Sequence, residues 1–107
     1  MIVDTDRTEQ TIPTLQDLRR QREAILSIAA RNKARDVRVF GSVARGDATP
    51  ESDVDFLVTF EPGASLYDLS GIVIDLRELL GCQVDVADAD TRDRDFLRHI
   101  AQEVVSL

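Results

Sequence analysis

Two aspartates, Asp53 and Asp55, follow a Gly-Ser pair after ten residues in the stretch FGSVARGDATPESDVDF. Side chains alternate across a strand, so we expect both carboxylates on one face, where they repel each other unless a cation lies between them. Asp85 is expected to present a third carboxylate to the same volume, because Val84 and Val86 supply the apolar side of its strand. Three carboxylates with no histidine or cysteine beside them favour Mg²⁺ or Mn²⁺ over zinc.

A short turn of small residues precedes the aspartates. Ser42 is expected to open a helical turn whose free backbone N–H groups, together with its hydroxyl, form an anion site, and Gly41 and Arg45 lie beside it in the sequence. Phosphate at this turn and metal at the aspartates predict phosphoryl or nucleotidyl transfer assisted by two metal ions.

The same residues have plainer interpretations. An isolated Asp-x-Asp pair is also typical of a solvated strand start, and Ser42 also fits a plain helix cap. Arg45 fits a surface ion pair with Asp47 or Glu51 equally well. The combination of the Gly-Ser turn with a third aspartate favours the chemical interpretation.

The elements that must position these residues follow from hydrophobic periodicity. A first helix is expected from Thr14 and a last helix from Thr91, whose buried stripe comprises Leu97, Ile100, Ala101 and Val104. Between them the pattern predicts a strand in VRVFG, a longer strand in DVDFLVTF, a helix in LYDLSGIVIDLRELLG that stops at Gly81, and a strand in CQVDVAD.

The connections between these strands predict the topology. The first two are joined by a short excursion, which suits antiparallel neighbours, and the last two are joined through a helix, which makes them parallel. We therefore expect an α/β domain over residues 14–107 with a mixed three-stranded core sheet flanked by helices, preceded by a flexible tail over residues 1–13.

Composition narrows the class of protein further. The 107 residues suit one domain, and the formal net charge of −7 disfavours long nucleic acids as partners, because tracking a phosphate backbone needs a surplus of Lys and Arg. No apolar stretch reaches membrane-spanning length and the N-terminus lacks the pattern of a signal peptide, so we expect a cytoplasmic protein without a membrane partner.

Five other residues of chemical interest are expected to have structural or surface roles. His99 falls off the apolar stripe of the last helix, and Tyr67 is expected to pack near the start of its own helix. Cys82, the single cysteine, fits a small buried hydrophobic residue. Asp88 and Asp90 follow the third strand as loop acids.

The sequence from Val37 to Asp88 resembles a known family. The Gly41-Ser42 pair, the Asp53-Val54-Asp55 triplet ten residues later and the subsequent Val-Asp-Val are similar to the minimal nucleotidyltransferases (MNT) of the polymerase-beta superfamily, and especially to the MntA-type antitoxins encoded beside HEPN-type ribonuclease toxins. The resemblance implies the minimal nucleotidyltransferase fold, transfer of AMP from ATP, and an acceptor tyrosine on the partner toxin.

These observations lead to one expected function and two alternatives. We expect metal-dependent nucleotidyl transfer, with Asp53, Asp55 and Asp85 catalytic and metal-binding, and with Gly41, Ser42 and Arg45 on the ATP phosphates. The resemblance implies that larger relatives hold the acceptor with a second domain, for which we expect no room in these 107 residues, so a partner protein is expected to supply the acceptor hydroxyl. The chain also has no tryptophan and few aromatic residues with which to stack bases. The alternatives are a non-enzymatic antitoxin that occludes a basic partner, and a transferase acting on small molecules such as aminoglycosides.

Overall fold

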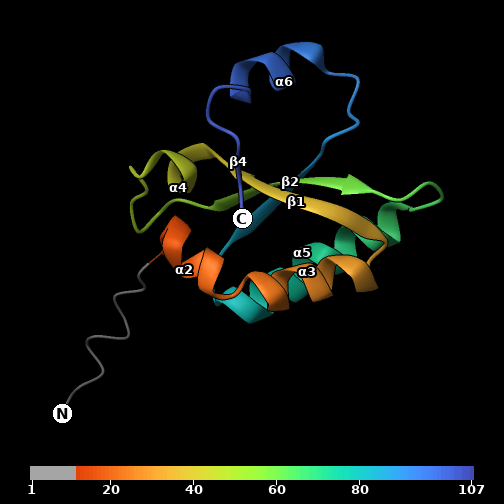
Figure 1. Ribbon diagram of the computed structural model, residues 1–107, viewed down its shortest axis with the longest axis horizontal. Coiled ribbons are helices and arrows are strands. Elements are labelled where there is room, and N and C mark those ends of the chain that lie inside the picture. The colour runs from red at the N-terminus through yellow and green to blue at the C-terminus, as the bar shows by residue number, and fades with distance from the viewer. Residues whose placement is uncertain (1–11) are drawn as a thin grey trace.

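The computed structural model describes residues 12–107, in which four strands form one sheet with helices on both faces (Figure 1). The residues of the predicted tail up to position 11 lie outside this described part. The elements, in chain order, are α2 (Leu15–Arg20), α3 (Arg22–Arg31), β1 (Ala34–Phe40), α4 (Gly41–Arg45), β2 (Val54–Phe60), α5 (Leu66–Leu80), β3 (Val84–Asp88), α6 (Arg94–Ile100) and β4 (Val105–Ser106). No helix in this part of the chain is long and apolar enough to cross a membrane.

Local sequence signals set the ends of the helices. Thr14 caps α2 and Ser65 caps α5, each within a capping box closed by an aspartate three residues later. Helix α5 ends where Gly81 adopts the left-handed conformation, at φ 70°, as the sequence predicts. The segment that follows Gly81 is thereby directed into β3, the strand that carries Asp85.

The sheet has the order β3-β2-β1-β4. Strand β2 pairs antiparallel with β1 and parallel with β3, which confirms both predicted relations. In this register Asp55 lies between Phe40 on one side and Asp85 on the other. The end of β1 and the first half of β3 are therefore brought to the same row of the sheet as Asp55.

Two hydrophobic layers cover the sheet. Val54, Phe56 and Val58 face α3 and α5 in the larger layer, as expected from their alternation. Phe40 and Leu57 face the other way and pack with Ile100 of α6. The rings of Phe40 and Phe96 meet edge to face, with centroids 5.7 Å apart, so α6 is anchored at the end of β1.

The C-terminal segment differs from the prediction of one long helix. Helix α6 ends at Ile100, the chain turns, and β4 adds a fourth strand beside β1, through Arg38↔Ser106 and Val39↔Val105. Ala101 is exposed, whereas Val104 reaches the Ile100 cluster after the turn. The prediction was wrong because a short helix followed by a turn can bury the same apolar residues as one long helix. The consecutive valines Val104 and Val105 also favour a strand over a helix.

The N-terminal helical segment is interrupted once. Gln21 departs from helical geometry, at φ −102° and ψ 18°, and divides the predicted single helix into α2 and α3. Leu18 before the break and Ile25 after it are both fully buried in the larger layer. The break leaves the predicted apolar face in contact with the sheet.

The contact between α3 and α5 provides a test of this layer. The Nδ2 of Asn32 donates to the backbone oxygen of Ile28 at 2.9 Å and to Oδ2 of Asp75 at 3.1 Å, and a Cβ on Gly71 would overlap the Oδ1 of Asn32. We expect Gly71→Ala to destabilise the protein, although alanine is the better helix former by about 1 kcal/mol. In an Asn32→Ala background the same change should stabilise it. Urea denaturation of the four proteins measures this coupling, and equal effects in both backgrounds would contradict it.

Candidate active site

A tight turn joins β1 directly to α4 and forms one wall of the site. Gly41 has φ +80°, and a Cβ at this position would overlap the Oδ2 of Asp55. Glycine is thus required here both by backbone conformation and by the close approach of the Asp55 carboxylate. The turn and the aspartate of β2 are therefore in direct contact.

The residues of α4 differ in detail from the prediction. The N-cap position is Phe40, which has no side-chain cap, so the interpretation of Ser42 as a helix cap is wrong. The backbone oxygen of Ser42 instead accepts hydrogen bonds from Gly46 and Asp47, at 2.9 and 3.0 Å. Among residues 12–107 the Ser42 hydroxyl makes no hydrogen bond, which leaves it available to a ligand.

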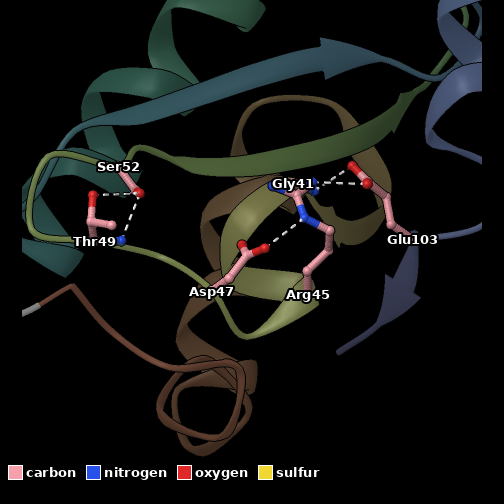
Figure 2. Close-up of polar contacts among 6 residues, drawn as sticks. All are labelled: Gly41, Arg45, Asp47, Thr49, Ser52 and Glu103. Carbon is pink, nitrogen blue, oxygen red and sulfur yellow. Dashed lines mark hydrogen bonds and ion pairs between the residues drawn. The ribbon is translucent and has the colours of Figure 1, made fainter.

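The loop between α4 and β2 is held by a compact turn, seen at one side of Figure 2. Thr49 donates its backbone N–H to the hydroxyl of Ser52 at 2.8 Å, and Ser52 returns its own N–H to the backbone oxygen of Thr49 at 2.9 Å. Val54 then donates to the backbone oxygen of Gln83 at 3.0 Å and starts β2. Asp53 is therefore the last residue before the strand, at the exposed entrance to the site.

The three predicted aspartates gather at this end of the sheet. Asp55 is paired with Asp85 in the parallel register, and Asp53 precedes it by two residues. Burial raises the pKa of Asp55 to about 6, and the negative charges of Asp85, Asp53 and Glu103 act in the same direction. Arg45 lowers the pKa of Asp55 but does not compensate. The metal-free chain thus holds a half-buried carboxylate among like charges.

This arrangement suits a divalent cation without forming a complete cage. Within residues 12–107, no three His, Cys, Asp or Glu side chains are arranged closely enough to enclose a metal ion by themselves. The acidic side chains near Asp55 offer carboxylate oxygens, the ligands that Mg²⁺ and Mn²⁺ prefer. Mg²⁺ commonly binds only one or two carboxylates and completes its coordination shell with phosphate oxygens and water. A cation here would offset both the desolvation and the repulsion that raise the pKa of Asp55.

Glu103 is a residue of the site that the sequence analysis missed. Its carboxylate accepts the N–H of Gly41 at 2.9 Å and a guanidinium N–H of Arg45 at 2.9 Å (Figure 2). Arg45 also pairs with Asp47 at 3.2 Å, so the predicted ion pair with Asp47 is present, whereas the second partner is Glu103 and not Glu51. Glu103 was not predicted as a site residue, because in the long predicted helix it would lie far from the end of β1.

The other residues that the sequence analysis considered lie outside the cluster around Asp55. His99 is exposed on α6, as predicted. Tyr67 is 90% exposed, so the expectation that it packs near the start of α5 is wrong. Asp88 and Asp90 lie at the far end of β3, where the Asp88 carboxylate accepts the Asp90 N–H at 2.8 Å. Cys82 is half-buried against the larger layer, and burial raises the pKa of its thiol.

Comparison with known proteins identifies the class to which this site belongs. The nucleotidyltransferase domain family matches residues 18–104, which include every residue of the cluster. The chain belongs to this family and is a nucleotidyltransferase.

The relatives place it among the small members of the family. Protein adenylyltransferase MntA of Thermococcus cleftensis is 38% identical over 71 residues, which are 66% of this chain and 72% of that protein. A Methanocaldococcus jannaschii protein whose name proposes a protein adenylyltransferase is 40% identical over 62 residues, 58% of this chain and 67% of the relative.

Solved structures agree with the fold. One whose name proposes a minimal nucleotidyltransferase is 43% identical, covers 88% of this chain and 96% of its own, and superposes with a TM-score of 0.75. Another, a toxin-antitoxin structure with AMP-PNP, is 19% identical, covers 78% of this chain and 69% of its own, and has a TM-score of 0.67. The four-stranded mixed sheet is thus a minimal nucleotidyltransferase fold, with one strand more than the sequence predicted.

The raised pKa of Asp55 predicts a pH-dependent effect on stability. Because the folded pKa of about 6 exceeds the ordinary value of 3.8, the unfolded chain releases this proton first as pH rises, and the metal-free protein loses stability between about pH 4 and pH 6. Asp55→Asn should therefore raise the melting temperature above pH 6 and have little effect below pH 4. We expect a gain of a few degrees, because Asp55 is only half-buried and solvent screens the repulsion.

Thermal melting in a chelator at pH 4 and pH 7.5 measures this effect. Glu78→Gln, which removes a charge at an exposed position of α5, provides the matched control and should not reproduce the gain. A destabilised Asp55→Asn protein at pH 7.5 would show that the carboxylate is satisfied by its surroundings and not repelled by them.

Proposed function

We propose that this chain transfers AMP from ATP to a hydroxyl group of a partner protein, and that the partner is a HEPN-type toxin whose activity the transfer suppresses. The observation that carries the proposal is the contact between the Gly41 turn and Asp55. It places groups that can donate hydrogen bonds to phosphate beside the carboxylates of Asp55 and Asp85, which can bind a metal ion. The names of the relatives, protein adenylyltransferase and toxin-antitoxin, support the choice of a protein acceptor.

The turn would bind the triphosphate. The backbone N–H of Gly41 and the free hydroxyl of Ser42 can donate to phosphate oxygens, and the guanidinium of Arg45 can pair with them through two parallel hydrogen bonds. These three groups lie on consecutive residues or one helical turn apart. They would fix the nucleotide so that its α-phosphate lies toward the aspartates.

The aspartates would hold the metal ions and orient the acceptor. Asp53 and Asp55 would bind two Mg²⁺ ions, for which Mn²⁺ can substitute, and Asp85 would share the ion on the acceptor side. When bound, the ions make the acceptor hydroxyl a better nucleophile and neutralise charge on the pyrophosphate that leaves. Asp85 would orient this hydroxyl and take its proton as the new bond to the α-phosphorus forms and the bond to pyrophosphate breaks.

The raised pKa of Asp55 fits this role. A carboxylate that is repelled by its neighbours in the metal-free protein gains more from a cation than a solvated carboxylate does. Asp55 lies between the Gly41 turn and Asp85, so a cation that it holds would neutralise charge beside both groups. This is the expected arrangement for an enzyme that uses Mg²⁺ together with ATP.

A double substitution separates transfer from simple occlusion of the partner. Asp53→Asn with Asp55→Asn keeps the size of both side chains, removes two charges from the metal site and leaves the outer surface nearly unchanged. We expect the variant to fold and to bind the toxin encoded beside it, but to add no AMP. Incubation with ATP and Mg²⁺, followed by intact mass measurement of the toxin, checks this, with the unsubstituted protein in a chelator as the control.

The outcome also decides between the alternative functions. If the double variant neutralises the toxin fully at substoichiometric amounts and adds no mass to it, occlusion is sufficient and the proposed mechanism is wrong. If the unsubstituted protein leaves the toxin unmodified but adenylylates an aminoglycoside, the acceptor is a small molecule.

A further inference from the structure

The carboxylate of Glu103 binds two of the groups that the proposed function assigns to the ATP phosphates. One oxygen accepts the N–H of Gly41 and the other accepts an N–H of Arg45, each at 2.9 Å (Figure 2). The Glu103 side chain is only 19% exposed, so this contact is more protected than an ordinary surface ion pair. Glu103 therefore occupies both donors in this structure.

We propose that Glu103 takes the place of a phosphate group in the nucleotide-free protein, and that ATP binds by displacing it. The inference rests on the proposed function, because it assumes that Gly41 and Arg45 bind the triphosphate. It adds a residue of the C-terminal segment, 62 positions from Gly41 in sequence, as a competitor for the nucleotide site.

The chemistry of the contact resembles that of a bound phosphate. A carboxylate and a phosphate are both anionic acceptors that can take one hydrogen bond from a guanidinium and another from a backbone N–H. A single backbone N–H can serve only one of them well, and two anions at the same donors repel each other. Glu103 and a phosphate therefore exclude each other at Gly41.

The backbone of Glu103 is fixed, so the displacement is a movement of the side chain. Glu103 donates its N–H to the backbone oxygen of Ile100 at 2.9 Å, and Ile100 is 3% exposed. On the other side, Val105 pairs with Val39, and Arg19 donates to the backbone oxygen of Ser106 at 2.8 Å. These contacts hold the segment against β1 while the carboxylate changes position.

Space for that movement lies next to the contact. A cavity of about 400 Å³ is lined by residues of α4 and of the C-terminal segment, namely Ala44, Arg45, Gln102, Glu103 and Val105. This open space is where the Glu103 side chain would turn when it leaves Gly41. Arg45, which lines the same cavity, can keep its second pair with Asp47 during the exchange.

Glu103→Gln tests the proposal, because the neutral amide offers one acceptor oxygen in place of two and no charge. Calorimetric titration should give dissociation constants for Mg²⁺-ATP and for inorganic triphosphate that are about three- to tenfold lower than those of the unsubstituted protein. Adenosine, which carries no phosphate, should bind both proteins equally. Glu78→Gln removes a charge at an exposed position of α5 and should leave all three constants unchanged.

The possible results separate this inference from the proposed function. If Glu103→Gln binds ATP as well as or more weakly than the unsubstituted protein, Glu103 does not compete with the nucleotide and the inference is wrong, while the proposed AMP transfer is unaffected. If neither protein binds ATP or triphosphate, both proposals fail. Thermal melting verifies that the variant is folded, and Glu103→Ala provides a second variant with the same expected sign.

Discussion

The contact between the Asp55 carboxylate and the backbone of Gly41 constrains the whole site. It leaves no room for a side chain at position 41 and requires a backbone conformation that glycine adopts readily. It also places a carboxylate half inside the protein, beside Asp85 and near Asp53, where its charge is unfavourable. A domain gains no stability from such a cluster. On the proposed function, a cation and phosphate groups that bind there would offset this unfavourable free energy, so the contact is better explained by function than by folding.

The architecture around this contact follows from the position of β2 in the sheet. Its antiparallel neighbour brings the end of β1, with Gly41 and α4, to the row of Asp55, and its parallel neighbour brings Asp85 to the same row. Only a mixed sheet places a strand end and a strand beginning on either side of one residue in this way. The two hydrophobic layers hold β2 from both faces, and α6, anchored through Phe40 and Phe96, delivers the C-terminal segment to the site.

The parts that could be predicted from sequence are those encoded locally. The short connection between β1 and β2 and the helical connection between β2 and β3 were sufficient to predict both sheet relations. Together with the alternation of side chains along β2, they predicted that Asp53, Asp55 and Asp85 lie in one region. The role of Glu103 could not be predicted, because it depends on where α6 ends, and the apolar spacing of Leu97, Ile100 and Val104 suits a longer helix equally well. The exposure of Tyr67 was missed for a related reason, since helical periodicity does not show that the first turn of α5 leaves Leu66 and Tyr67 exposed.

The proposed function requires that the carboxylates and the groups that donate hydrogen bonds to phosphate form one site around Asp55. The most direct measurement is anomalous X-ray diffraction from crystals grown with Mn²⁺ and a non-hydrolysable ATP analogue. We expect Mn²⁺ bound to Asp53 and Asp55, the triphosphate on Gly41, Ser42 and Arg45, and the Glu103 carboxylate turned away from Gly41. Mn²⁺ bound elsewhere, or a nucleotide whose phosphates do not contact the Gly41 turn, would contradict it.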